Sequence, residues 1–325
     1  MARLPSLLAG LLLASRCPLA ARAALVGASV VPHGDFALLP SLLAPGSSNR
    51  TRAQALHDAA VASAAAIAEA RPDVVLLVAP HAIALTADFA IYESSALLGT
   101  ALVGGDLHNA SAPLFPFTAA AAGAPAFAAN LTANLTASLA GANVSGLLAF
   151  GDAVPGPLQW SEVVPISLLA SALNGSQPGQ PGIVVWAQPQ RRLVCASCMV
   201  PELLALGAAL AAFADDSPAR VFVLVSADLS HVHSAGVNPY PPDDAVADAF
   251  DAAVGQWAAA LDREALVGKA AALADDALSC GFTGLVLLEG ALRASRSAPW
   301  KPSLLAQPSA PTYYGMAVAT FTQAN

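Results

Sequence analysis

Four short runs of apolar, mostly β-branched residues recur along the chain and predict buried strands. They are Ala24–Val31, Val74–Ala79, Ile183–Trp186 and Val221–Ser226. Apolar runs of this length without polar alternation are typical of strands that are covered on both faces, as in a parallel sheet. A further run, Thr312–Phe321, predicts a last strand near the end of the chain.

Helical patterns lie between these strands. Arg52–Ala70 ends before a proline, Pro201–Ala214 begins with one, Asp243–Leu261 has acidic residues in its first turn, and Cys280–Ala294 is apolar. A proline just beyond its last residue ends a helix, whereas proline and acidic side chains are favoured in its first turn. Strand and helix in alternation predict an α/β fold, a three-layer αβα arrangement with a largely parallel central sheet. We expect one catalytic domain over residues 24–325.

The first 23 residues have the layout of a secretory signal peptide, with a first helix of the domain as the alternative. Arg3 precedes the apolar run Leu4–Ala14, and Ala21-Arg22-Ala23 resembles a cleavage site. Six of the eight asparagines also begin an N-x-S/T triplet, which predicts glycosylation. These are Asn49, Asn109, Asn130, Asn134, Asn143 and Asn174. We therefore expect the secretory pathway (extracellular or lumenal), or a plastid reached through the signal peptide.

Composition narrows the class of protein. Hydrophobic residues make up 56% of the 325-residue chain and charged residues 11%, with a net charge of -8. A disordered chain would show the opposite pattern, and a protein that neutralises nucleic-acid phosphates would carry basic runs. The uncharged stretch Ala110–Phe150 is interrupted by proline and glycine, so it predicts loops and short elements rather than a membrane span.

Three cysteines remain after removal of the signal peptide. Cys195 and Cys198 form a CxxC pair, for which we expect a local disulfide; a redox motif or half a zinc site are the alternatives. Cys280 is left without a partner.

Three of the six histidines follow predicted strands. His33 comes after the first strand, His81 after the second, and His231 shortly after Val221–Ser226. The carboxyl ends of parallel strands lie at one edge of the sheet, so we expect these imidazoles to converge there. Two histidines and an anionic side chain form the ligand set of non-haem Fe(II), and a third histidine can move protons. A zinc hydrolase would use a similar set.

The other three histidines have simpler interpretations. His57 lies on a predicted helix and His108 beside a glycosylation triplet, so both are expected at the surface. His233 is a rival of His231, but it lies two residues further into the loop.

Several motifs occur in an order that resembles a known superfamily. They are Val31-Pro32-His33-Gly34-Asp35, Pro80-His81, Ser226-Ala227-Asp228-Leu229-Ser230-His231, Cys280-Gly281 and the closing Tyr313-Tyr314-Gly315. Together they resemble the catalytic, B-type subunits of the class III extradiol ring-cleavage dioxygenases (protocatechuate-cleaving type), a superfamily that also includes the Memo-like proteins. The resemblance covers nearly the whole chain after the signal peptide.

The resemblance implies a metal ion at the carboxyl ends of the strands and a ring-cleavage reaction. His33 and His81 would be metal ligands and His231 the acid/base residue. The reaction would be the opening of a catechol-like ring next to its diol, with Fe(II) as the cofactor and a small aromatic compound and O₂ as substrates. Zinc or copper are alternative metals. No nucleic-acid partner is expected, and a homo-oligomer or a second subunit is possible.

The third ligand departs from the ring-cleaving pattern. Ring-cleaving members supply a glutamate there and Memo-like proteins a cysteine, and the matching residue here is Cys280. Glu289 lies nine residues further on; a helix rises about 13.5 Å over that length, so the two cannot share one ion. Asp275 and Asp276 are fallback ligands. We expect the position of Cys280 at a helix N-terminus to favour its thiolate.

A second departure concerns a histidine that several ring-cleaving members carry near the site. Trp160 stands at that position. It would shape the site or stack against an aromatic substrate, and a core tryptophan is the alternative. Asp35 and Asp228 are further candidates for the substrate pocket. Two alternatives to the dioxygenase stay open: a Memo-like redox or scaffold protein without ring cleavage, and a zinc hydrolase on the same fold.

Overall fold

A computed structural model describes residues 24–104, 113–139, 141, 143–148, 150–152, 154–173, 179–297, 299–308 and 310–324. The predicted signal peptide lies outside the described residues, as do His108, Asn109 and Asn174.

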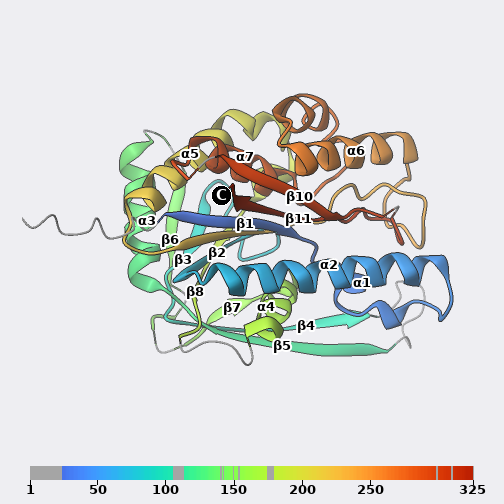
Figure 1. Ribbon diagram of the computed structural model, residues 1–325, viewed down its shortest axis with the longest axis horizontal. Helices are drawn as coiled ribbons and strands as arrows, with labels where there is room; N and C mark the ends of the chain where they lie inside the picture. Colours follow the sequence, from blue (N-terminus) through green and yellow to red (C-terminus); the bar gives the residue numbers. More distant parts are fainter. Residues whose placement is uncertain are drawn as a thin grey trace, which may run out of the picture.

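The larger of two sheets contains eight strands, in the order β10-β11-β1-β9-β2-β8-β3-β6 (Figure 1). Its strands are β1 Leu25–Val31, β2 Val74–Ala79, β3 Phe89–Tyr92, β6 Val144–Leu147, β8 Gly182–Ala187, β9 Val221–Ser226, β10 Trp300–Ala306 and β11 Val318–Gln323. The four adjacent strands β1, β9, β2 and β8 pair in parallel. These are the four apolar runs of the sequence, and their prediction as buried strands is confirmed.

The prediction of a three-layer αβα fold with a largely parallel sheet is wrong. β11 pairs antiparallel with β1 and with β10, and β3 pairs antiparallel with β8, so the sheet is mixed. The physical reason lies in the connections. A parallel neighbour needs a crossover segment, usually a helix. Residues 80–88 contain no helix, and neither do the described residues of 307–317.

A second sheet adds a further layer. It consists of β4 Ala96–Gly104, β5 Leu114–Ala122 and β7 Gly156–Leu158, in the order β5-β4-β7. The short elements expected between residues 110 and 150 are β5, helix α3 (Pro125–Ser138) and β6. Small alanine side chains leave little contrast between the two faces of β5, so its strand pattern is weak in the sequence.

Helices cover both faces of the larger sheet (Figure 1). On one face lie α2 (Ser48–Ala70) and α4 (Trp160–Leu173), with the small sheet packed outside α4. On the other lie α3, α5 (Val200–Asp216), α6 (Asp244–Ala260) and α7 (Phe282–Ala294). A short helix, α1 (Asp35–Leu38), follows β1. The four helices predicted from the sequence are confirmed as α2, α5, α6 and α7.

Among the described helices, Ser197–Asp216 is long and apolar enough to cross a membrane by length and composition. Buried core helices of folded domains meet the same criteria. Its buried side chains, including Leu203, Leu206 and Leu210, belong to the core that α5 shares with α7.

α5 and α7 approach each other closely at two glycines. A Cβ atom on Gly207 would lie 2.1 Å from the carbonyl oxygen of Leu287, and one on Gly290 would lie 2.5 Å from that of Leu204. The two backbones are therefore in direct contact, which fixes the position of α7 against the core.

We predict that Gly207→Ala destabilises the protein. Alanine is the better helix former by about 1 kcal/mol, but the overlap with backbone should outweigh this and leave a net loss of about 1–3 kcal/mol in the free energy of unfolding. Ala205→Leu, on the exposed side of α5, is the control and should change stability by less than about 0.5 kcal/mol. Urea unfolding measures both. A stabilised Gly207→Ala variant would contradict the close approach.

Candidate metal centre

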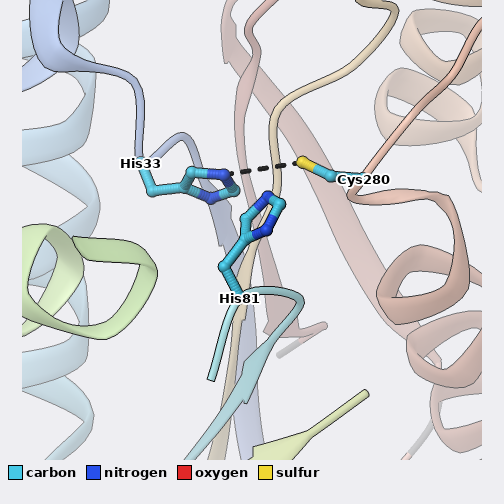
Figure 2. Close-up of side chains that lie close together, drawn as sticks. All are labelled: His33, His81 and Cys280. Carbon is cyan, nitrogen blue, oxygen red and sulfur yellow. Dashed lines mark hydrogen bonds between the residues drawn. The ribbon is translucent and has the colours of Figure 1, made fainter. Parts of the chain in front are cut away.

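The candidate site lies where three adjacent parallel strands end. His33 follows β1, His81 follows β2, and both Asp228 and His231 follow β9. Cys280 arrives from the opposite side, two residues before α7 (Figure 2). The first turn of α7 rests on the same strand ends, since a Cβ atom on Gly284 would lie 2.8 Å from Val225 Cγ1.

Two overlapping groups of side chains could hold a cation. His33, His81 and Cys280 each offer one ligand atom, and these atoms lie within 4.8 Å of one another. Asp228, His231 and Cys280 meet the same criterion. Cys280 belongs to both groups, and its Sγ lies 3.5 Å from His33 Nε2 (Figure 2). The structure thus brings all three predicted histidines to one place.

Hydrogen bonding sets the tautomer of His33. The Ser226 hydroxyl donates its single proton to the carbonyl oxygen of Ser161, at 2.6 Å. It must therefore accept from His33 Nδ1, which lies 2.9 Å away. With the proton on Nδ1, the lone pair of Nε2 faces Cys280. A hydrogen bond of this kind, from the far ring nitrogen, is typical of metal-binding histidines.

Asp228 presents a carboxylate to the same point. Its Oδ1 accepts hydrogen bonds from the backbone N–H groups of His33 and Gly34, at 3.1 and 3.2 Å. Its Oδ2 lies 3.3 Å from His33 Nε2. Because that nitrogen carries a lone pair, the contact is favourable only with a proton or a cation between the two atoms. Burial raises the pKa of Asp228 to about 7. Among the described residues, no nearby positive charge offsets this effect.

Sequence reasoning placed Asp228 in the substrate pocket and missed it as a candidate ligand. Its spacing of three residues from His231, just after a buried strand, is the signal that could have found it.

The imidazoles are held in their neutral form. Burial, followed by the nearby positive charges, lowers the pKa of His81 to about 3. Burial lowers the pKa of His231 to about 4 and that of His33 well below its ordinary value. Since metals bind neutral imidazole, these side chains are ready to act as ligands at neutral pH.

Cys280 behaves differently from the sequence expectation. Burial, with the charge of Asp228 as a smaller cause, raises the pKa of its thiol. Among the chain's own groups, burial therefore outweighs the helix N-terminus, and the expected preference for a thiolate is wrong. A coordinated cation would reverse this, because it deprotonates a thiol directly.

The other proposed third ligands lie elsewhere. Glu289 is fully buried and accepts hydrogen bonds from Trp257 Nε1 and Arg293 Nε, each at 2.8 Å. Asp276 is exposed. Neither belongs to a group of candidate ligands among the described residues, whereas Cys280 and Asp228 do.

The CxxC pair forms the predicted disulfide, Cys195–Cys198. Asp275 accepts hydrogen bonds from the backbone N–H groups of Ala196 and Ser197, at 2.6 and 3.4 Å. It therefore holds the disulfide loop against the segment that leads to Cys280, and it is not a ligand in the candidate groups.

Aromatic side chains line the site on two sides. Trp160 is 44% exposed and stacks on His81, with ring centroids 4.7 Å apart. The rings of Tyr313 and Tyr314 lie 6.0 and 5.9 Å from that of His231. Trp160 was predicted from the sequence, whereas the two tyrosines were noted only as part of a motif. Asp35 Oδ2 accepts a hydrogen bond from the Gly104 backbone at 2.8 Å, so its carboxylate anchors the end of β4.

The remaining histidines and asparagines lie outside the cluster. His233 Nε2 lies 2.9 Å from Asp251 Oδ2, and His57 Nδ1 lies 2.9 Å from the carbonyl oxygen of Ala37. Of the predicted glycosylation sites that the structure describes, Asn130, Asn134 and Asn143 are exposed and Asn49 is partly buried. Their glycosylation stays a prediction.

Comparison with known proteins adds little. No protein-family model matches the chain, and no curated protein matches it. A crystal structure of the uncharacterized protein JW3007 from Escherichia coli K12 is similar, at 17% sequence identity and a TM-score of 0.48. The match covers 91% of this chain and 99% of that one. A similarity of this degree carries no functional argument.

We predict that Ser226→Ala weakens metal binding. Without the hydroxyl, the His33 Nδ1 proton has no acceptor there and the ring is free to change tautomer, so affinity should fall about 10–100-fold. Titration with Co²⁺, followed by its visible absorption, measures this. Ser29→Ala is the matched control, because Ser29 is also buried on a central strand and its Oγ has no hydrogen-bond partner among the described residues. Equal affinities in both variants would contradict the proposed role.

We also predict a pH effect of His231→Gln on stability. The His231 pKa is about 4 in the folded protein against 6.5 ordinarily, so between these values the unfolded chain binds the extra proton. The stability that the neutral ring contributes is therefore complete above pH 6.5 and lost as the pH falls. The raised pKa of Asp228 acts in the opposite sense but is common to both proteins.

The slope of the unfolding free energy against pH should accordingly be smaller in His231→Gln, by up to about 1.4 kcal/mol per pH unit. Urea unfolding across this range, with a chelator present, measures the difference. Parallel slopes in the two proteins would show that His231 titrates normally.

Proposed function

We propose that this chain is a non-haem Fe(II) dioxygenase of the extradiol type, which opens a catechol-like ring next to its two hydroxyl groups with O₂. The observation that carries the proposal is the cluster of His33, His81 and Cys280, in which Ser226 sets the lone pair of His33 toward the other ligands. The ordered motifs that resemble the extradiol superfamily support it independently.

The donor set fits a transition metal. His33 and His81 would hold the ion with Cys280, and Asp228 would stand as an alternative or additional ligand. When bound, the ion would supply a Lewis-acid centre that holds the diol and O₂ side by side. Imidazole and thiolate suit iron, copper and zinc, whereas the carboxylate of Asp228 adds a harder donor.

The surrounding side chains have separate tasks in this proposal. Trp160, which is exposed and stacked on His81, offers a flat face against which an aromatic ring can lie. His231 follows the same strand end and is neutral, because burial lowers its pKa, so in this proposal it would accept a proton from a substrate hydroxyl. The tyrosine rings next to His231 limit the access of water on that side.

A second candidate function is a Memo-like metal-binding redox protein without ring cleavage. One observation favours it: the third ligand that joins both histidines is the thiol of Cys280. Thiolate is a softer ligand than carboxylate and favours copper or zinc.

A secretory location remains part of the proposal. The Cys195–Cys198 disulfide supports it, since disulfides persist in oxidising compartments. The exposed glycosylation triplets at Asn130, Asn134 and Asn143 also support it.

We predict that protein purified without added metal contains iron, and that anaerobically iron-loaded protein consumes O₂ and forms a yellow ring-fission product from a catechol. His231→Gln should keep its iron but lose about 10²–10⁴-fold in turnover, because the proton acceptor is gone. An oxygen electrode and absorbance on a panel of diols measure this. Bound iron without turnover of any diol would refute the dioxygenase, and stoichiometric zinc would point to a hydrolase.

Cys280→Ala separates the ligand sets within the same experiment. If the thiolate is the third ligand, this variant should lose most of its metal. Full metal content in Cys280→Ala together with loss in Asp228→Asn would instead assign the carboxylate, and would remove the observation that favours the Memo-like candidate.

A further inference from the structure

The Cys195–Cys198 disulfide lies directly before a long helix. The segment after β8 forms the 3₁₀ helix Gln190–Leu193, and a 3₁₀ turn, Ser197–Met199, continues without a break into α5. The pair is therefore at the N-terminus of a helical run of 20 residues, Ser197–Asp216. A ring closed between cysteines three residues apart adds little to global stability, so reinforcement of the fold does not explain it.

The backbone around the disulfide is anchored before and after the pair. The Nη2 of Arg192, which is 8% exposed, donates a hydrogen bond to the carbonyl oxygen of Pro80 at 2.8 Å. The neighbouring Arg191 pairs with Glu202 in the first turn of α5, at 2.7 Å. These contacts present the two sulfur atoms from a defined position.

The pair is open to solvent, in contrast to the buried free thiol of Cys280. Cys198 is exposed and Cys195 is partly buried. Two large apolar side chains directly before the pair, Leu193 and Val194, are 72% and 86% exposed. Adjacent apolar side chains at this exposure offer a contact surface to an apolar partner, and here that surface borders an accessible disulfide.

The two sulfur atoms have different surroundings. The Cys198 backbone N–H donates to Cys195 Sγ, with 3.3 Å between the nitrogen and the sulfur. This N–H and the helix N-terminus both stabilise negative charge on the Cys195 sulfur. When the disulfide opens, Cys195 is therefore the better leaving group, and an incoming thiolate attacks the more exposed Cys198.

A carboxylate next to Cys195 favours the reduced pair. Asp275 Oδ2 lies 3.7 Å from Cys195 Sγ, and its Oδ1 accepts a hydrogen bond from the Ala196 backbone at 2.6 Å. In the disulfide this sulfur carries no proton, so the two atoms face each other without a hydrogen bond. Reduction supplies an S–H that Asp275 accepts. A structural disulfide has the opposite property, because the native fold then stabilises its oxidised form.

We propose that Cys195 and Cys198 form a thiol–disulfide exchange site, which oxidises cysteine pairs in extended polypeptide segments with apolar flanks. Leu193 and Val194 would contact the flanking side chains. This activity goes beyond the proposed dioxygenase and needs no metal.

The exchange has two steps. A substrate thiolate attacks Cys198 Sγ and forms a mixed disulfide, while Cys195 leaves with the electron pair and takes a proton from water. The second substrate thiolate then attacks the substrate sulfur of the mixed disulfide, and Cys198 leaves and is protonated in turn. Two substrate thiols are oxidised to one disulfide, and the protein disulfide gains two electrons. A small-molecule disulfide, such as glutathione disulfide, reoxidises the pair.

The redox equilibrium of the mature chain tests the proposal. The protein is equilibrated with reduced and oxidised glutathione in the presence of a chelator, and alkylation followed by mass spectrometry gives the reduced fraction. The reference is the linear peptide Leu193–Met199 with the same disulfide, which lacks the helix and Asp275. The equilibrium constant for reduction should be at least about tenfold larger in the protein. A constant equal to or below that of the peptide would identify a structural disulfide and overturn the proposal.

Asp275→Asn tests the source of this preference. Asparagine keeps an oxygen for the Ala196 N–H but replaces the second oxygen with an amide nitrogen that cannot accept the thiol proton. The constant should fall at least about threefold toward the peptide value. Asp276→Asn removes the neighbouring exposed carboxylate and is the matched control, which should keep the wild-type constant. Equal constants in the two variants would overturn the stabilisation of the reduced pair by Asp275.

The apolar surface predicts a substrate preference. Val194→Ser should slow the oxidation of a dithiol peptide with leucine flanks about three- to tenfold and leave that of dithiothreitol, which has no side chains, unchanged. Val61→Ser is the control, because Val61 is also exposed, lies on α2 and has a helix propensity close to that of serine. If Val194→Ser slows both probes equally, or neither, the apolar-flanked polypeptide is refuted as the substrate. Failure of ring cleavage with exchange intact would refute the proposed function alone.

Discussion

The parallel pairing of β1, β9, β2 and β8 is the constraint on which the candidate site depends. Hydrogen bonding keeps adjacent strands about 4.8 Å apart, so residues that leave neighbouring strands at the same edge are within reach of a shared ligand. His33, His81, His231 and Arg192 come from four different strand exits. They are far apart in the sequence, and the backbone ladder alone brings them together. α7 packs against the site from the other side, and the segment just before it supplies Cys280.

Burial then determines the chemistry of these groups. It keeps the imidazoles neutral and raises the pKa of the Asp228 and Cys280 side chains, so it opposes the charged form of each of these groups. A cation would change this state: it would displace the protons of the acidic groups and so be bound with proton release. The hydrogen bonds from Ser226 and from the backbone of His33 and Gly34 keep the donors in place in either state.

The parts of the fold that the sequence predicts are those with strong local patterns. The four central strands are unbroken apolar runs, and α2, α5, α6 and α7 have clear ends. The edges of the sheet could not be predicted, because the direction of β3 and β11 depends on connections whose described residues form no helix. The small sheet was missed because β5 is rich in alanine, and its partner β4 is recognisable only through that pairing.

The residues of the candidate site also divide into those that the sequence predicts and those that it does not. His33, His81 and His231 could be found because each follows a predicted strand. Glu289 could be separated from Cys280 by helix geometry, and its buried contact with Trp257 explains why an acidic residue lies within α7. Asp228 was placed near the site without its contact to His33. Arg192 has no local signature, since only the pairing of β8 with β2 brings it beside Pro80.

The disulfide has a consequence beyond its own loop. A ring closed between residues three apart removes little freedom from the unfolded chain, so its contribution to global stability is small. Its effect is local, because the loop that it closes contains the two backbone N–H groups that donate to the Asp275 carboxylate. The Asp275 carboxylate therefore connects the segment that follows Arg192 with the segment that precedes Cys280. Opening the ring would therefore loosen the segments on both sides of the candidate site, while the sheet beneath them stayed intact.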